Sequence, residues 1–322
     1  MKAIVQDKYG SPDVLELQEI DKPVVKDGQV LVRVHAAAVD PADWHIMRGL
    51  PYIARIAWGL LKPKDRVRGQ DVAGHVEAVG KDVKQLQPGD EVFGWCKGAF
   101  AEYACAGENN LAPKPTNLTF EQAAAVPLAA ATALQALRDV GKVQPGHRVL
   151  INGAAGGVGT FAVQIAKSFG AEVTGVCSAR NVDMVQSIGA DHVMNYTRED
   201  FTQSGQRYDL ILDNVANRSL TECRRALTGE GTLVSNSGTS GGRWIDGAGR
   251  VVKVNVLSPL VRQRLRAFVT KWNNEDLVVM KDLIESGKVT PVIDKTFPLS
   301  ETPQAIGYVE AGHARGKVVI SV

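Results

Sequence analysis

The spacing of apolar and polar residues changes close to residue 119. Before it, apolar stretches are short and bounded by turn residues, which predicts strands at 30–35 and 74–80 and a turn that enters a strand at 88–94. After it, helical segments alternate with apolar strands, beginning with helices at 120–125 and 129–140. The strands predicted in this part are 149–151, 173–177, 192–194, 208–213, 232–235 and 251–254. Six strands in such alternation indicate an α/β fold with a doubly wound parallel sheet.

The C-terminal part of the chain breaks this alternation. An amphipathic helix is predicted at 277–284 and a closing strand at 317–322, and neither extends the sheet of the middle part. We therefore predict a β-rich domain over 1–122, a dinucleotide-binding domain over 123–262, and a return to the first domain over 263–322. A cleft between the two domains is then the expected place for a cofactor.

A glycine-rich turn follows the strand at 149–151. The turn opens directly into a helix-patterned segment at 160–167, and it matches the dinucleotide fingerprint G-x-G-x-x-G with Ala154 in place of the first glycine. Such a turn bends sharply, lets the backbone approach a pyrophosphate, and points the amides of a helix N-terminus at it. The sequence therefore predicts a dinucleotide site with backbone contacts from Ala155, Gly156, Gly157 and Val158.

The end of the next strand indicates which dinucleotide binds. An NAD site usually carries Asp or Glu there to accept from the ribose 2′-hydroxyl, but this strand ends at Ser178 and Arg180. A guanidinium makes paired, charge-assisted hydrogen bonds with a phosphate, although an arginine at a loop tip can also be an ordinary surface residue. The sequence favours NADPH as the cofactor.

Composition limits the partners and the compartment. The chain has 322 residues, 44% of them hydrophobic, and a formal net charge of +2, which calls for neither a nucleic acid nor an anionic membrane. Two basic runs, 62–68 and 262–266, are interpreted as solvated faces. The four scattered cysteines form no paired motif, which predicts free thiols in a reducing compartment. With no signal-peptide pattern and no apolar stretch near the ~20 residues that span a bilayer, we expect a cytoplasmic protein without membrane insertion.

Three motifs together resemble one enzyme family. They are Pro88–Val92, with the sequence Pro-Gly-Asp-Glu-Val, the alanine-rich Ala123–Ala133, and the glycine turn Ala154–Gly159. In combination, and over nearly the whole chain, they resemble the medium-chain dehydrogenase/reductase superfamily, and within it the zinc-independent quinone oxidoreductases. The resemblance implies a GroES-like catalytic domain joined to a Rossmann domain.

The residues at the zinc positions of that superfamily predict a site without metal. Catalytic zinc needs about three protein ligands drawn from Cys, His and carboxylates. By the resemblance, the first ligand position, normally Cys, falls on Asp40, and the Gly-His-Glu motif is replaced by Gly69-Gln70-Asp71. The alanine-rich stretch carries no cysteine, and the segment 94–110 offers only two of the four that a structural zinc lobe needs.

A reaction without a Lewis acid favours a conjugated acceptor. Hydride addition to a quinone, or to the β-carbon of an enone, spreads the negative charge over a delocalised system and needs no metal for the oxyanion. We therefore expect an NADPH-dependent reductase of quinones or α,β-unsaturated carbonyls. Two alternatives stay open, an enoyl-thioester reductase of the same superfamily and a non-catalytic NADPH-binding protein. The sequence also leaves the physiological acceptor open.

The catalytic candidates are Asp40 and His45. By the resemblance, the segment 40–49 faces the nicotinamide, but many quinone oxidoreductases carry Asn at the position of Asp40, and an ionised carboxylate cannot donate to an acceptor oxygen. Asp40 equally fits a helix N-cap followed by Pro41, with Asp43 in the first turn. His45 aligns with the proton-relay histidine of zinc alcohol dehydrogenases, although Ala42 stands where the relay hydroxyl would be, so contact with ribose or solvent is its alternative role.

Apolar residues in the next segment predict an acceptor pocket, with core packing as the competing role. They are Trp44, Tyr52 and Ile53, with Ile56 and Trp58 as further candidates. The resemblance implies the remaining cofactor contacts, which are Thr132 and Lys317 near the nicotinamide half, Tyr196 near the 2′-phosphate, and Val215, Ser237 and Gly238 after later strands. It also offers a homodimer joined through an edge strand at 251–254, while the sequence leaves the oligomeric state open.

Overall fold

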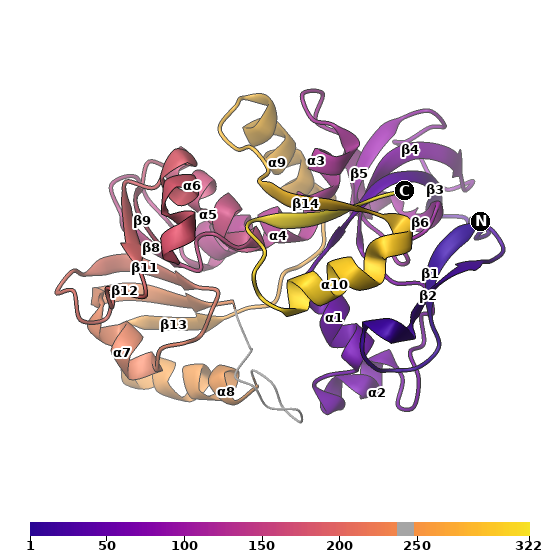
Figure 1. Ribbon diagram of the computed structural model, residues 1–322. Helices are drawn as coiled ribbons and strands as arrows, with labels where there is room; N and C mark the ends of the chain where they lie inside the picture. The colour runs from indigo at the N-terminus through magenta and orange to yellow at the C-terminus, as the bar shows by residue number, and fades with distance from the viewer. Residues whose placement is uncertain (237–247) are drawn as a thin grey trace. The chain divides into compact units, whose positions relative to one another are not determined.

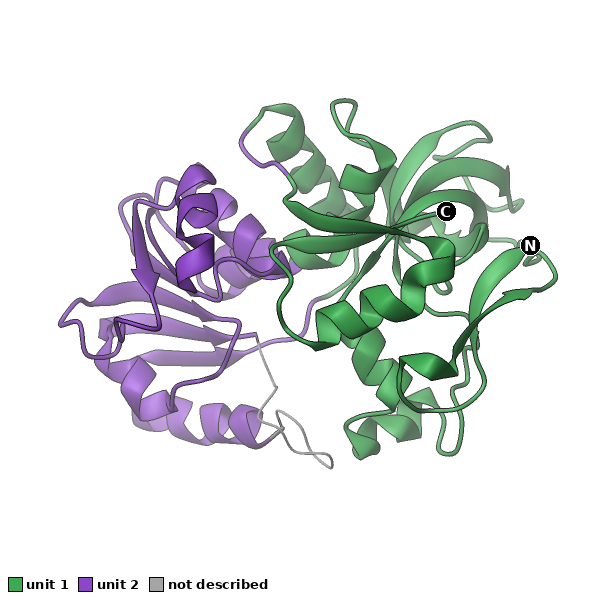
Figure 2. Cartoon of the chain, in the orientation of Figure 1, with its two compact units in different colours: residues 1–131, 271–287, 291–322 green, residues 132–270, 288–290 purple. Residues whose placement is uncertain are grey.

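A computed structural model describes residues 1–236 and 248–322, and the chain forms two compact units. Unit 1 comprises residues 1–131, 271–287 and 291–322, and unit 2 comprises 132–270 and 288–290 (Figure 2). The chain passes from unit 1 to unit 2 at 131/132 and returns at 270/271. The predicted domain limits, 122/123 and 262/263, lie earlier in the chain than these two points. The first passage lies inside one continuous helix, α4 (Pro127–Leu134), so no change of sequence pattern marks it.

Unit 2 is built on a six-stranded parallel sheet. Its strands are β8 (Arg148–Asn152), β9 (Glu172–Cys177), β10 (His192–Asn195), β11 (Tyr208–Asp213), β12 (Leu227–Ser235) and β13 (Arg264–Ala267). They lie in the order β10-β9-β8-β11-β12-β13, and all neighbours are parallel. The order reverses between β8 and β11, which confirms the doubly wound sheet predicted from the sequence.

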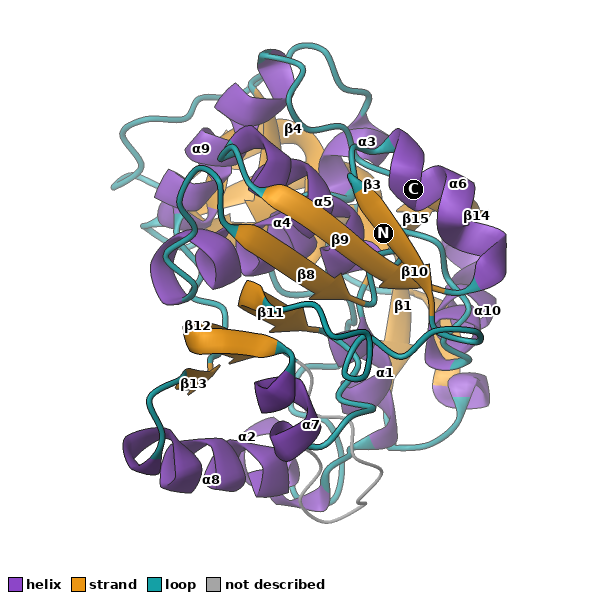
Figure 3. Ribbon diagram, turned by 90° about the vertical axis from the view of Figure 1, so that its left-hand side faces the viewer, coloured by secondary structure: helices purple, strands orange, loops and turns teal. Residues whose placement is uncertain are grey.

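Helices cover this sheet and close its core. They are α5 (Gly157–Ser168), α6 (Val182–Ser187), α7 (Leu220–Arg225) and α8 (Ala248–Leu257), with a π-helical segment at Gln135–Val140 after α4. α5 and α6 pack on the β8–β10 half, and α7 and α8 pack at the β12–β13 end (Figure 3). Because central parallel strands are covered on both faces, their side chains are apolar, and Leu150, Ile211 and Leu233 are fully buried.

Unit 1 contains a seven-stranded sheet and a two-stranded sheet. The strands are β1 (Lys2–Gln6), β2 (Leu15–Glu19), β3 (Gln29–Val39), β4 (Asp71–Val79), β5 (Glu91–Trp95), β6 (Tyr103–Gly107), β7 (Leu111–Pro113), β14 (Ile293–Pro298) and β15 (Lys317–Ser321). The larger sheet has the order β14-β15-β3-β4-β5-β7, and β6 also pairs with β3. The C-terminal strand β15 therefore lies beside β3, and the C-terminal strands, yellow in Figure 1, complete the sheet that the N-terminal half begins.

The α-helices of unit 1 are short. They are α1 (Pro41–Arg48), α2 (Arg55–Trp58), α3 (Phe120–Ala124), α9 (Asn274–Glu285) and α10 (Thr302–Glu310). The 3-10 turns among the residues that the structure describes are Pro12–Val14, Tyr52–Ala54, Glu108–Asn110, Ala179–Asn181, Ser258–Leu260 and Leu299–Glu301. Within the described ranges, no helix is both long and apolar enough to cross a membrane.

The strand predicted at 251–254 is wrong. These residues belong to α8, which buries Val254 and leaves Val252 59% exposed. A short run of β-branched residues favoured a strand, but the helical spacing of Val254 and Leu257 places both against the core of unit 2. The sixth strand is β13, in which only Leu265 is buried because arginines point outward from this edge strand. The basic run 262–266 was interpreted from the sequence as a solvated face, and β13 was therefore not predicted.

Candidate functional site

The predicted dinucleotide turn joins β8 to α5 in unit 2. Gly153 has a φ of 82°, a conformation that side chains with a Cβ rarely adopt, and its amide donates to the Val176 carbonyl at 3.1 Å. Gly156 is the N-cap residue of α5. A Cβ on Gly159 would lie 2.1 Å from the Gly153 carbonyl oxygen, so this position requires glycine. The fingerprint begins at Ala154 and so leaves out Gly153, which makes the bend.

The start of α5 fits an anion. The predicted contacts Ala155 and Gly156 precede the helix, and Gly157 and Val158 form its first two residues. No side chain caps this end of the helix, so the amides of the first turn keep their capacity to donate. These amides carry the positive end of the helix dipole, which favours a phosphate group. The residues present therefore fit the pyrophosphate of a dinucleotide.

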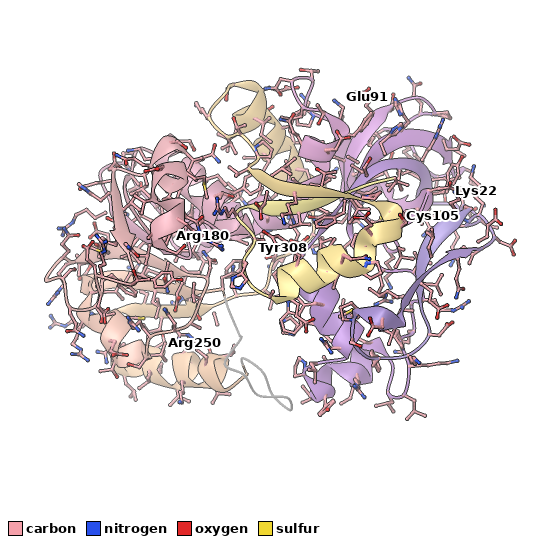
Figure 4. All side chains as sticks on the ribbon, in the orientation of Figure 1. Lys22, Glu91, Cys105, Arg180, Arg250 and Tyr308 are labelled. Atoms are coloured by element: carbon pink, nitrogen blue, oxygen red, sulfur yellow. The ribbon has the colours of Figure 1, made fainter. Side chains whose placement is uncertain are left out.

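Ser178, Arg180 and Tyr196 lie at the ends of two neighbouring strands. β9 and β10 are parallel, and the Tyr196 amide donates to the Cys177 carbonyl at 3.1 Å. Ser178 follows Cys177 directly, and its hydroxyl accepts from Asn181 Nδ2 at 3.1 Å. Arg180 and Tyr196 are exposed, and Arg180 is labelled on unit 2 in Figure 4. The structure thus places the three residues predicted for a 2′-phosphate close together.

A polar network that the sequence analysis missed fixes the ends of β8 and β11. The buried Asp213 carboxylate accepts from Asn152 Nδ2 at 2.8 Å and from the Val215 amide at 3.2 Å. Arg250 of α8 donates to the other carboxylate oxygen at 2.5 Å (Figure 4). Val215, a predicted cofactor residue, lies against the glycine turn, since a Cβ on Gly153 would be 2.8 Å from its side chain. The signal in the sequence was a polar residue at the carboxyl end of each of two apolar strands.

Of the other cofactor residues predicted in unit 2, the structure describes Thr132 but not Ser237 and Gly238. Thr132 is 5% exposed, and its hydroxyl lies 2.7 Å from that of Thr270. Ser237 and Gly238 lie outside the described residues, so their role stays a prediction. The placed candidates at strand ends follow the carboxyl ends of parallel strands, which is where doubly wound sheets bind ligands.

In unit 1, a cluster of buried charges joins three neighbouring strands. Lys317 Nζ lies 2.5 Å from Asp40 Oδ1 and 3.4 Å from Asp71 Oδ2, and all three side chains are at most 7% exposed. Burial alone would lower the pKa of Lys317, but the carboxylates of Asp40 and Asp71 outweigh it and raise that pKa. Burial, together with the charge of Asp40, raises the pKa of Asp71 well above its usual range. Lys317, predicted near the nicotinamide ribose, is thus held by two carboxyl groups.

This cluster does not fit zinc. Asp40, at the first ligand position of the superfamily, already holds an ammonium at 2.5 Å, and Gln70 offers only a neutral amide at the second. A divalent cation beside Lys317 would be repelled by a fixed positive charge. In residues 1–236 and 248–322, no three His, Cys, Asp or Glu residues are grouped so that they could hold a metal. The positive charge at this place comes from Lys317.

Asp40 and Asp43 form the start of α1. Asp40 is the N-cap residue with Pro41 at the first helical position, as the capping interpretation predicts. The Asp40 amide donates to Asp43 Oδ2 at 2.8 Å, and the Asp40 carboxylate bonds to Lys317. Burial, and secondly the charge of Asp40, raise the pKa of Asp43 to about 7, although Lys317 and Arg68 oppose the shift. Asp43 can therefore gain or lose a proton near neutral pH.

His45 is half-buried on the same helix. Its Nδ1 lies 3.2 Å from the Leu50 carbonyl oxygen, and its ring stacks on Trp44 with 3.5 Å between centroids. Trp44 packs against the hydrophobic core of unit 1. Both roles of His45, proton transfer and ribose contact, stay predictions.

A cavity of about 270 Å³ lies in unit 1 beside Asp43. Its wall includes Trp58, one of the predicted apolar candidates, but not Trp44, Tyr52 or Ile53. Tyr52 instead carries the Arg55 guanidinium 4.7 Å from its ring, and Ile53 is 58% exposed. The acceptor role of Trp44, Tyr52 and Ile53 therefore remains untested.

Two residues that line the cavity were missed by the sequence analysis. Arg68 is only 6% exposed, against the interpretation of 62–68 as a solvated face, because the chain turns inward at Val67 and Arg68. Trp272 comes from the C-terminal part of the chain and lines the same cavity. No spacing in the sequence connects it to Arg68.

Comparison with known proteins gives consistent matches over the whole chain. Residues 26–116 match the family model "Alcohol dehydrogenase GroES-like domain", which confirms the expected GroES-like domain, and residues 188–320 match "Zinc-binding dehydrogenase". The chain is 37% identical to mouse mitochondrial NAD(P)H oxidoreductase RTN4IP1, over 100% of this chain and 89% of the relative. It is 36% identical to the chloroplastic NADPH-dependent alkenal/one oxidoreductase of Arabidopsis thaliana, over 99% and 79%. Among solved structures, the quinone oxidoreductase from Coxiella burnetii superposes with a TM-score of 0.89 at 34% identity, over 100% and 99%.

Proposed function

Because the chain belongs to the medium-chain dehydrogenase/reductase superfamily, in the group of the quinone oxidoreductases and RTN4IP1-like proteins, we propose that it uses NADPH to reduce a quinone or an α,β-unsaturated carbonyl without a metal. The cluster of Lys317, Asp40 and Asp71 carries this proposal. A buried ammonium held by two carboxyl groups cannot coordinate an acceptor oxygen as a Lewis acid. A conjugated acceptor spreads the developing negative charge, so positioning and hydrogen bonding are enough.

In the proposed cofactor site, backbone and side chains have separate tasks. The amides of Ala155, Gly157 and Val158 hold the pyrophosphate at the start of α5, beside Gly156, whose amide donates to the Gly153 carbonyl. Ser178, Arg180 and Tyr196 hold the 2′-phosphate. When bound, NADPH supplies a hydride. The preference for NADPH over NADH is supported by the arginine after β9, where an acidic residue would serve an NAD site. Thr132, Val215, Ser237, Gly238 and Lys317 are proposed as further contacts.

Two groups of unit 1 are proposed to handle the proton that a reduced acceptor needs. Asp43 lines the cavity, and its carboxyl group has a pKa of about 7, so a fraction of the molecules hold a proton there at neutral pH. Asp40 positions Asp43 through the hydrogen bond from its amide. His45 is the second candidate because an imidazole can act as a general acid.

The test is NADPH oxidation by the purified full chain with a para-quinone, a 2-alkenal and a crotonyl thioester. We expect turnover with the quinone or the alkenal and little with the thioester. A preference for the thioester would assign an enoyl-thioester reductase, and NADPH binding without any turnover would assign a binding protein. The Gly159→Ala variant is the control, because its Cβ would meet the Gly153 carbonyl and disturb the turn that holds the pyrophosphate.

Location and assembly remain proposals. The name of the mouse relative places that protein in mitochondria, and the name of the Arabidopsis relative places that one in the chloroplast. For this chain we propose the cytoplasm; the free cysteines support a reducing compartment. A homodimer, if joined through the sixth strand at one edge of the parallel sheet, would use β13 and not the helical residues 251–254.

A further inference from the structure

The cavity of unit 1 contains a buried arginine that the proposed reaction does not use. Arg68 is 6% exposed, its Nε is buried without a hydrogen-bond partner, and no ion pair of the described residues includes it. An unpaired cation in such a place is unfavourable unless a ligand or solvent compensates it. Burial lowers the pKa of Arg68, whereas carboxylate partners raise the pKa values of Arg48 and Arg66.

The other charges around the cavity compensate this cation only in part. Lys97 lines the cavity but already pairs with Asp65 at 3.2 Å. Lys64 also lines it, and none of the described ion pairs includes Lys64. Two carboxyl groups of the cavity act on Arg68, namely Asp43 and Asp65. Asp65 is exposed and pairs with Lys97, and Asp43 retains a proton in part of the molecules near pH 7. The cavity therefore offers positive charge to whatever enters it.

The backbone that carries Arg68 is held in place. Gly69 has a φ of 92°, and a Cβ there would lie 2.7 Å from the Phe100 ring, so the turn after Arg68 requires glycine. The Phe100 amide donates to the Arg68 carbonyl at 2.9 Å, and the Cys96 amide donates to the Gln70 carbonyl at 2.9 Å. A backbone that is fixed directly after an arginine reduces the entropy that ordering a ligand contact would cost.

We propose that this cavity is the acceptor subsite and that Arg68 binds a carboxylate group of the acceptor, so that the natural acceptor is a small anionic enone, enal or quinone. A guanidinium presents two parallel donors that match the two oxygens of a carboxylate. Trp58 and Trp272 supply apolar walls for the rest of the molecule, and Lys64 adds a second positive charge. The volume of about 270 Å³ limits the acceptor to a small molecule.

This inference rests on the proposed function, and three acceptors separate the two. They are 2-hexenal, 6-oxo-4-hexenoate and the methyl ester of the latter, which share one conjugated aldehyde and differ in a remote group. With saturating NADPH, we expect the wild type to show a kcat/KM at least tenfold higher for the carboxylate than for the ester. If the protein reduces none of these three acceptors and does not reduce the quinone, the proposed function is wrong. Reduction of all three without preference for the carboxylate would overturn only the role of Arg68.

Variants test the residue itself. Arg68→Gln should lower kcat/KM for the carboxylate ten- to a hundredfold, the range expected for a lost charge-assisted hydrogen bond, and change the values for hexenal and the ester less than twofold. Arg68→Lys should recover part of the loss, because it restores the charge without the paired donors. Arg66→Gln is the matched control, since Arg66 is exposed, pairs with Asp7 and does not line the cavity. An equal loss for all three acceptors in Arg68→Gln would overturn the proposal and make Arg68 a structural residue.

The wild type alone provides a second test, which holds even if Arg68→Gln does not fold. Hexanoate should inhibit the reduction of 2-hexenal competitively, with an inhibition constant at least tenfold lower than that of hexanamide, which has the same chain and no charge. Equal inhibition by both, or none by hexanoate, would overturn the anion subsite.

Discussion

Replacing Lys317 with methionine removes the ammonium from the buried cluster and keeps much of the side-chain volume. In the wild type, Nζ is 2.5 Å from Asp40 and 3.4 Å from Asp71, and Lys317 is 2% exposed. Removing one partner of a buried pair leaves an uncompensated charge and costs about 3–5 kcal/mol of unfolding free energy. The loss should be largest above neutral pH. At lower pH Asp71, whose pKa is raised by burial, is protonated in the folded variant, which relieves the buried charge.

A second variant separates charge compensation from simple packing. In Lys317→Met/Asp40→Asn the strongest carboxylate partner is neutral as well, so most of the lost stability should return. The control is Lys22→Met, because the Lys22–Glu77 pair has a similar distance of 2.9 Å but side chains 40% and 39% exposed (Figure 4). An exposed pair contributes no more than about 1 kcal/mol.

Urea unfolding followed by tryptophan fluorescence measures these differences. Four of the five tryptophans belong to unit 1, which contains the cluster, so the signal reports mainly on that unit. A shift of the midpoint at constant m is the expected result. The reasoning fails if Lys317→Met loses no more than Lys22→Met, or if the double variant is no more stable than the single one. If the double variant folds but binds NADPH at least tenfold more weakly, Lys317 also has the cofactor role that the resemblance implies.

Three further predictions follow from the described contacts. Arg180→Ala should raise the KM for NADPH ten- to a hundredfold and hardly change that for NADH, since a charge-assisted bond to phosphate contributes about 1.5–3 kcal/mol; equal losses for both cofactors would contradict the 2′-phosphate role. Asp43→Asn should flatten the pH dependence of stability. Burial raises the pKa of Asp43 from 3.8 to about 7, so the stability from its neutral carboxyl is complete below 3.8 and is lost as pH rises through 7, by about 1.4 kcal/mol per pH unit. Equal slopes for variant and wild type in urea unfolding would refute this. Turnover should persist in excess chelator, and elemental analysis that finds about one zinc per chain would disprove the metal-free site.

Features that depend on local geometry could be predicted from the sequence. The glycine turn was found because a sharp bend and a close helix start need glycine at fixed spacings, and Gly159 indeed leaves no space for a Cβ. The start of α1 was found because Asp40 and Pro41 are the residues that an N-cap and a first helical position favour. In both cases neighbouring residues determine the backbone.

Features that depend on tertiary contacts could not be predicted. Lys317 and Asp40 are separated by 277 positions and meet only because β15 pairs with β3. Arg68 was interpreted as part of a solvated basic run, although the backbone hydrogen bonds around it bury its side chain. The apolar run at 251–254 was interpreted as a strand because a short β-branched segment carries no period that excludes a helix.

Two buried cations of unit 1, Lys317 and Arg68, differ in whether their charge is available to a ligand. Lys317 is enclosed with Asp40 and Asp71, so its charge is neutralised inside the protein and cannot polarise an acceptor oxygen. Arg68 lines a cavity, has no described partner, and lies near a carboxyl group that can carry a proton at neutral pH. The carboxylate that we propose on the acceptor needs a cation whose charge is not already neutralised. In unit 1 the cavity with Arg68 offers such a cation, whereas the charge of Lys317 is taken up by the buried carboxylate cluster.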